Sequence, residues 1–140
     1  MKPKWTGIYP ALTTKFTDDF KVDIPSCIKN VEAQINSGIH GCVIAGSLGE
    51  ASTLTQDEKI FLLKEISNHV NGRIPVLMNI AEQSTAEAVK AAENAQEAGA
   101  DGLMMLPPMR YVSDDRETIE FYKSVASSCN LPIMTYNNPH

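Results

Sequence analysis

The sequence lacks an excess of basic residues and any long apolar run. Its 140 residues include 12 Lys and Arg against 17 Asp and Glu, a formal net charge of −5 at neutral pH. This balance argues against binding to nucleic acid or to an anionic membrane surface, because both need positive charge. The first residues, MKPKWTGIYPALTT, contain no uninterrupted apolar segment and no small-residue cleavage site. We therefore expect no secretory signal and a cytoplasmic protein.

Cysteine and histidine are also scarce. The three cysteines, Cys27, Cys42 and Cys129, are odd in number, widely spaced and without a C-x-x-C pair. We expect them to be small buried residues and to form neither a disulfide framework nor a zinc site. The three histidines are equally dispersed, with no second ligand at helical spacing, so we expect no metal site.

The sequence alternates between short apolar runs, which are typical of strands, and longer amphipathic stretches, which are typical of helices. Short, nearly continuous apolar runs are typical of strands that are covered on both faces, as in a parallel sheet. They span residues 7–14, 41–46, 74–80, 102–106 and 131–137. Longer amphipathic stretches separate them, with apolar residues at three- and four-residue steps. The clearest stripes are Ile24, Ile28, Val31 and Ile35, and then Ile60, Leu63, Ile66 and Val70.

Helix start and stop signals agree with this reading. Thr55 with Glu58, and Ser84 with Glu87, have the spacing of a capping box, in which a hydroxyl and a carboxylate satisfy early helix amides. Glycines follow the expected helix ends at positions 38, 72 and 99, where a left-handed backbone favours glycine. Each helix is then followed at once by a strand.

This order of elements fits a parallel α/β sheet built from right-handed crossovers. An open nucleotide-binding sheet would need a glycine-rich turn after its first strand, but PALTTKFTDD contains no glycine. A (β/α)₈ TIM barrel is therefore favoured. Because a whole barrel needs about 250 residues, residues 1–140 are expected to form a single domain that is the N-terminal portion of a barrel, with its first five strands. An open-sheet, receiver-like module fits less well, since Asp18 and Asp19 lie too far beyond the first strand.

Two motifs on different strands carry a family resemblance. The stretch GSLGEASTLTQDEK, residues 46–59, resembles the G-T-T-G-E-S/A-x-T-L-x-x-x-E motif of the dihydrodipicolinate synthase and N-acetylneuraminate lyase family. The stretch LPIMTYNNP, residues 131–139, resembles the family's L-P-x-x-x-Y-N-x-P strand. The similarity runs through essentially the whole chain.

The resemblance implies a class I aldolase in which a lysine on the sixth barrel strand forms a Schiff base with pyruvate or another 2-oxo acid. It implies no cofactor and a homo-oligomer, either a dimer or a tetramer. A protonated imine is a strong electron sink, which is why such enzymes need no metal. We expect none of the lysines on the predicted helices to replace the Schiff-base lysine of the sixth strand, because each should face solvent or the outer ring of helices. These are Lys59, Lys64, Lys90 and Lys123.

The same resemblance assigns roles to the glycine-containing turn. It implies that amides and the hydroxyl around Ser47 and Leu48 hold the substrate carboxylate, with Gly46 in the same binding turn. Gly46 and Gly49 would permit the turn. Tyr136 would pass protons to and from the imine and the cleaved groups, and the Ser47 hydroxyl would hydrogen-bond to it.

Three departures separate this chain from a typical dihydrodipicolinate synthase. Pro108 and Met109 stand in place of the family's two tyrosines, and Tyr111 could substitute only if the loop is rearranged. Leu48 replaces a threonine and offers an amide without a hydroxyl. We therefore expect a different family member that acts on a 2-oxo acid as an aldolase, dehydratase or deaminating hydrolyase. The alternative is an inactive, truncated half-barrel that pairs with a partner chain.

Overall fold

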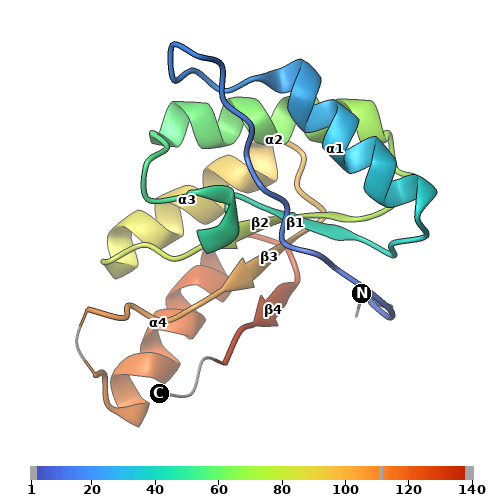
Figure 1. Ribbon diagram of the computed structural model, residues 1–140. Helices are drawn as coiled ribbons and strands as arrows, with labels where there is room; N and C mark the ends of the chain where they lie inside the picture. The colour runs from blue at the N-terminus through green and yellow to red at the C-terminus, as the bar shows by residue number, and fades with distance from the viewer. Residues whose placement is uncertain (1–2, 111, 138–140) are drawn as a thin grey trace.

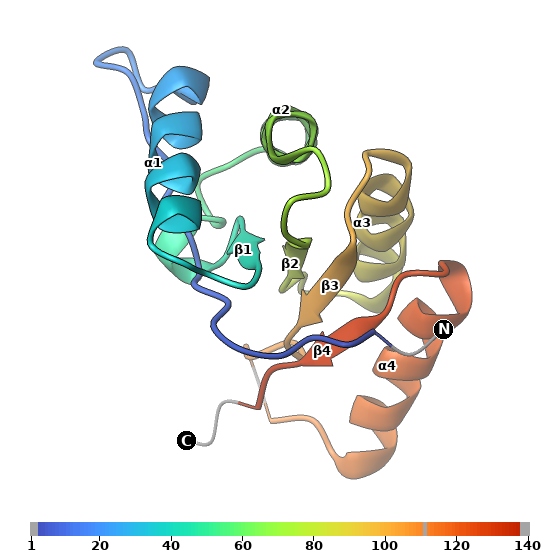
Figure 2. The same cartoon turned by 90° about the vertical axis from the view of Figure 1, so that its right-hand side faces the viewer.

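The computed structural model describes residues 3–110 and 112–137. Strands and helices alternate along the chain, and the strands form one parallel four-stranded sheet in the order β1-β2-β3-β4. The elements are α1 (Ile24–Asn36), β1 (Cys42–Ile44), the 3₁₀ turn η1 (Ser47–Gly49), α2 (Gln56–Val70), β2 (Val76–Ile80), α3 (Thr85–Glu97), β3 (Gly102–Met105), α4 (Asp115–Ser128) and β4 (Ile133–Thr135). The helices lie in an arc on one side of the sheet (Figures 1 and 2). This is the N-terminal portion of a (β/α)₈ barrel, as predicted.

The first predicted strand, residues 7–14, is only partly confirmed. It runs beside β1 but forms a single parallel bridge, between Ala11 and Val43. The Leu12 amide donates to Val43 O at 2.8 Å, and the Val43 amide donates to Pro10 O at 2.9 Å. Pro10 has no N–H of its own, so the ladder cannot extend at that residue.

The core lies between the sheet and the helices. Every second strand residue packs against the helices. Examples are Cys42 and Ile44 in β1 and Met78 and Ile80 in β2, which belong to one buried cluster with residues of the helices. The predicted helical stripes also contribute, with Val31 of α1 fully buried. The other strand residues face the opposite, concave side of the sheet. That concave face is the one which a barrel encloses.

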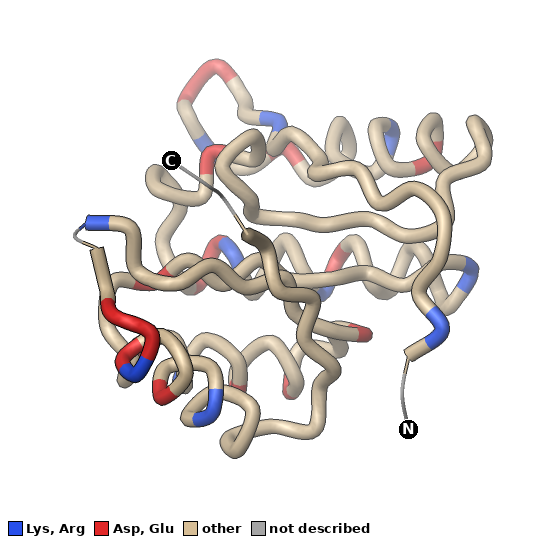
Figure 3. The backbone as a smooth tube through the Cα atoms, turned by 90° about the horizontal axis from the view of Figure 1, so that it is seen from below, with Lys and Arg blue, Asp and Glu red and all other residues tan. Residues whose placement is uncertain are grey.

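Charged residues lie on the helices and loops, and none lies in a strand (Figure 3). The Thr55–Glu58 capping box is present with both hydrogen bonds. Ser84 accepts from the Glu87 amide and its hydroxyl donates to the Glu87 carboxylate, but among the described residues that carboxylate makes no return bond to the Ser84 amide. Gly38, Gly72 and Gly99 adopt positive φ angles as predicted. None of the helices in the described part of the chain is long and apolar enough to cross a membrane.

An ion cluster joins α1 to α2 and predicts a pH-dependent stability. Arg73 donates to both carboxylate oxygens of Glu32, at 3.0 and 2.8 Å, and His69 contacts the same carboxylate at 2.9 Å. The hydrogen bonds from Arg73 and then His69 lower the pKa of Glu32 to about 2. Because the folded-state pKa is depressed, the stabilisation is complete above the unfolded value of about 4.3 and is lost as the pH falls towards 2.

We expect Glu32→Gln to lower the urea midpoint at pH 7, and the difference from the wild type to shrink between about pH 5 and pH 2. Glu93, which is exposed on α3, provides the matched control, and Glu93→Gln should change the midpoint little at either pH. A pH-independent effect of Glu32→Gln would show that the carboxylate acts through packing and not through its charge.

Candidate active site

The turn after β1 is held in a strained backbone. Ala45 precedes it and Glu50 ends it, and both non-glycine residues adopt left-handed φ angles, 51° and 55°. Such conformations cost on the order of 1–3 kcal/mol each and cluster at functional sites. Ser47 and Leu48 are exposed at the top of this turn, whereas Gly49 is buried. The strain therefore lies on both sides of the residues for which the sequence predicts a binding role.

The hydrogen bonds of the turn leave two amides free. The amides of Gly49 and Ala51 donate to Gly46 O, at 2.9 and 3.2 Å, and the Glu50 amide donates to Ser47 O at 3.1 Å. Within the described residues, the amides of Ser47 and Leu48 have no acceptor. Two successive free amides in an exposed turn form a concave site that suits an anion such as a carboxylate.

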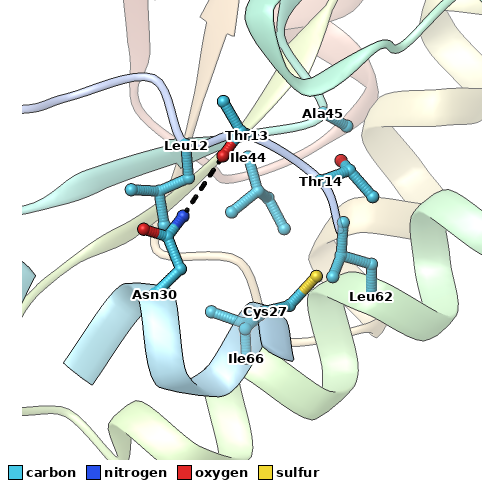
Figure 4. A pocket seen from close by; sticks show the side chains of 9 residues that line it. All are labelled: Leu12, Thr13, Thr14, Cys27, Asn30, Ile44, Ala45, Leu62 and Ile66. Atoms are coloured by element: carbon cyan, nitrogen blue, oxygen red, sulfur yellow. Dashed lines mark hydrogen bonds between the residues drawn. The ribbon is translucent and has the colours of Figure 1, made fainter. Parts of the chain in front are cut away.

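Thr14 holds this turn from below. Its side chain is buried, and its hydroxyl donates to Gly49 O at 2.6 Å. Thr14 lines a small cavity together with Cys27 and Leu62, as Figure 4 shows. The cavity has a volume of about 10 Å³. A space of this size is at the lower limit for one water molecule. The Gly49 carbonyl therefore depends on Thr14 for its partner.

Only one of the two turn glycines is required by the structure. A Cβ atom on Gly49 would lie 2.8 Å from Leu12 O, a backbone atom that cannot swing away. Gly46 has φ −81° and ψ −176°, which any residue adopts, and its nearest neighbour would be Ala11 Cβ at 3.8 Å. The turn therefore requires glycine at Gly49 but not at Gly46.

Removing the Thr14 hydroxyl should destabilise the protein. Thr14→Val keeps the side-chain shape but leaves Gly49 O buried without a donor, so we expect the free energy of unfolding to fall by about 1–3 kcal/mol. Urea unfolding measures this change. Thr14→Ser retains the hydroxyl and should behave like the wild type. Thr13→Val removes only a contact of 3.5 Å with Asn30, and an equal loss in that variant would argue against a special role for Thr14.

Tyr136 follows β4, at the same carboxyl edge of the sheet as Ser47. Its amide donates to Met105 O at 2.8 Å, which fixes the backbone, and its side chain is 46% exposed. β2 and β3 separate β1 from β4 in the sheet. Within the described residues, neither the Ser47 hydroxyl nor the Tyr136 hydroxyl has a hydrogen-bond partner. The predicted hydrogen bond from Ser47 to Tyr136 is therefore not formed in this structure, and the pairing stays a prediction.

The structure corrects the expectation for one lysine. Lys64, Lys90 and Lys123 are exposed on their helices, but Lys59, in the first turn of α2, is only 8% exposed. Its ammonium contacts Glu82 Oε1 at 3.1 Å, and Gln56 donates to the same oxygen at 3.0 Å. Glu82 follows the end of β2, so this ion pair lies at the carboxyl edge and not on the outer ring.

Two of the three cysteines are buried as the sequence predicts, and the prediction is wrong for Cys129. Cys27 and Cys42 are buried, Cys129 is half-buried, and all three are free thiols. Burial, and to a lesser degree the Asp101 carboxylate, raises the pKa of Cys42 to about 12. This thiol stays protonated and serves packing.

Tyr111, which could replace a missing family tyrosine, lies outside the described residues.

Comparison with known proteins decides the family. The model of the dihydrodipicolinate synthetase family matches residues 4–140. The chain belongs to this family. A 4-hydroxy-tetrahydrodipicolinate synthase from Moorella thermoacetica is 33% identical over 136 residues, which cover 97% of this chain and 47% of that enzyme.

Solved structures agree with the sequence match. The chain resembles YagE of Escherichia coli K12, a member of the same family that was solved in complex with pyruvate, with a TM-score of 0.92 and 33% identity over 98% of this chain and 46% of that one. It also resembles the N-acetylneuraminate lyase of Mycoplasma synoviae, with a TM-score of 0.85 and 25% identity over 95% and 46% of the two chains. The chain thus spans about half the length of the relatives that it matches.

Proposed function

We propose that residues 1–140 carry the carboxylate-binding turn and the proton-relay tyrosine of a Schiff-base lyase or synthase, of the aldolase or dehydratase type. Its substrate is pyruvate or another 2-oxo acid. The observation that carries this proposal is that the amides of Ser47 and Leu48, at the carboxyl edge of the sheet, have no acceptor in the part of the chain that the structure describes. Membership of the family and the pyruvate complex of YagE support the choice of ligand.

The proposed chemistry assigns a task to each part of the chain. The Ser47–Gly49 turn binds the carboxylate, so the adjacent keto carbon faces the concave side of the sheet. There the amine of a lysine, which the resemblance places on the sixth barrel strand, adds to the carbonyl and water leaves. Loss of a C3 proton gives an enamine, whose carbon adds to the carbonyl of the second substrate while that oxygen takes up a proton. Water then hydrolyses the product imine, which releases the product and frees the lysine. Tyr136 carries these protons.

Borohydride trapping tests this proposal. Full-length protein incubated with pyruvate and sodium borohydride should gain a reduced, covalent pyruvate adduct in the mass spectrum. Peptide mapping should place the adduct on a lysine outside residues 1–140. An adduct on Lys59 would overturn the assignment of the nucleophile, and the absence of any adduct would refute the Schiff-base proposal. Ser47→Ala and wild type should be compared at a pyruvate concentration below saturation, where the variant should trap more slowly.

We also propose that the enzyme acts in the cytoplasm as a homo-oligomer, a dimer or a tetramer.

One observation favours a second candidate function, a non-catalytic half-barrel that binds a partner chain. Within the described residues, β4 pairs only with β3, and Ile133, Met134 and Thr135 remain partly or fully exposed. A free strand edge of this kind can pair with another strand. Size-exclusion chromatography separates the candidates, because a stable complex with a different chain, without a pyruvate adduct, would favour the second.

A further inference from the structure

The amide of Leu48 lies at the end of a chain of hydrogen bonds that crosses the turn after β1. This amide belongs to the same peptide group as Ser47 O, which accepts from the Glu50 amide at 3.1 Å. The Glu50 amide belongs to the same peptide group as Gly49 O, which accepts from the Thr14 hydroxyl at 2.6 Å. Two peptide groups therefore connect the Thr14 hydroxyl to an amide that has no acceptor among the described residues.

Hydrogen bonds that form a chain polarise one another. A carbonyl that accepts a hydrogen bond draws electron density from the N–H of its own peptide group, which becomes a stronger donor. The effect is larger away from water, and here Thr14 is only 6% exposed and Gly49 is buried. Every bond of the chain also runs from donor to acceptor in the same sense, from Thr14 towards Leu48. The chain therefore strengthens the Leu48 amide as a donor and fixes its direction.

The amide of Ser47 is not connected to Thr14 in this way. It belongs to the same peptide group as Gly46 O, which accepts from two backbone amides at 2.9 and 3.2 Å. Thr14 is thus linked to one of the two donors that the turn offers to a carboxylate. Loss of its hydroxyl should weaken the binding of a carboxylate but not abolish it.

We infer that Thr14 is a positioning residue that orients and strengthens the Leu48 amide for the carboxylate of a 2-oxo acid. This inference rests on the proposed function. Thr14 acts through the backbone, because its own side chain is buried beside Cys27 of α1 and Leu62 of α2. Its role concerns the binding of the carboxylate and not the covalent step, which takes place at the neighbouring keto carbon.

The test measures the initial rate of borohydride trapping in the full-length protein over a range of pyruvate concentrations. Thr14→Val should raise the half-saturating pyruvate concentration about three- to tenfold, because one of two hydrogen bonds to a charged group is weakened and not lost. The maximal trapping rate should stay close to that of the wild type. Thr14→Ser keeps the hydroxyl and should restore the wild-type concentration.

A destabilised variant with an unaltered turn provides the matched control. Val125 is fully buried on α4, a helix that packs against α3. Val125→Ala removes buried methyl groups and lowers the stability of the fold. All variants are compared at a temperature well below their thermal midpoints. Under these conditions Val125→Ala should leave the half-saturating pyruvate concentration unchanged.

The outcomes distinguish this inference from the function on which it rests. A wild type that forms no adduct with pyruvate refutes the proposed function. If the wild type forms the adduct, the role of Thr14 is overturned by an unchanged half-saturating concentration in Thr14→Val, by an equal rise in Val125→Ala, or by a failure of Thr14→Ser to restore it, and the function stands. Should Thr14→Val fail to fold, Thr14→Cys, whose thiol is a weak donor, gives the same comparison.

Discussion

Tyr136→Phe should lower kcat of the full-length protein by about 10²- to 10⁴-fold, the range over which a positioned acid or base contributes to a reaction. The substitution removes one oxygen from a side chain that is 46% exposed and has no hydrogen-bond partner among the described residues. The fold should therefore not depend on that oxygen. Steady-state kinetics with pyruvate, together with a thermal unfolding curve, measure both effects.

A second tyrosine provides a matched control. Tyr122 of α4 donates its hydroxyl to Met105 O at 3.0 Å, the same carbonyl that accepts from the Tyr136 amide. Burial raises the pKa of Tyr122, so its hydroxyl remains a donor over the whole neutral range. Tyr122→Phe should cost about 1 kcal/mol of unfolding free energy and leave kcat almost unchanged. If the two variants showed the same kinetics, Tyr136 would have no special role.

Gly49→Ala should have the second largest effect. The new Cβ atom would lie 2.8 Å from Leu12 O, so either the turn or the first chain segment must shift. Overpacking of this kind costs about 1–3 kcal/mol of unfolding free energy. Because the shift moves the amides of Ser47 and Leu48, and a misplacement of about 1 Å can cost a hundredfold, we expect kcat/KM for pyruvate to fall by roughly that factor.

Gly46→Ala is the matched control for the fold. It places the same methyl group in the same turn, but at 3.8 Å from its nearest neighbour and in an extended backbone. Its thermal midpoint should stay close to that of the wild type. A large loss of stability in Gly46→Ala would contradict the account of how the turn is packed.

The parts of the fold that follow a simple period were predictable from the sequence. Helices α1 and α2 show their buried stripe directly, and four of the five apolar runs are strands. The first run is shortened because a proline interrupts the ladder, an effect that depends on which strand becomes its neighbour. The family and the turn after β1 were also predictable, because each of the two motifs is a continuous stretch of sequence.

The remaining site residues depend on packing that no local pattern shows. Lys59 is the fourth residue of α2, after a polar helix start that predicts exposure. The helix begins against the loop that follows β2, however, and Glu82 of that loop pairs with Lys59. Thr14 is one of several polar residues after the first apolar run. Asn79 is the single polar residue in the run VLMNI. That its side chain faces the concave side of the sheet follows only from the strand pairing and not from the sequence.

The most direct test of the central claim is a crystal structure of the full-length protein after pyruvate and borohydride have formed the reduced adduct. We expect the carboxylate to accept hydrogen bonds from the amides of Ser47 and Leu48, with the Tyr136 hydroxyl within hydrogen-bond distance of Ser47. A carboxylate bound elsewhere, with those two amides still unpartnered, or Ser47 and Tyr136 separated by packed side chains, would contradict it.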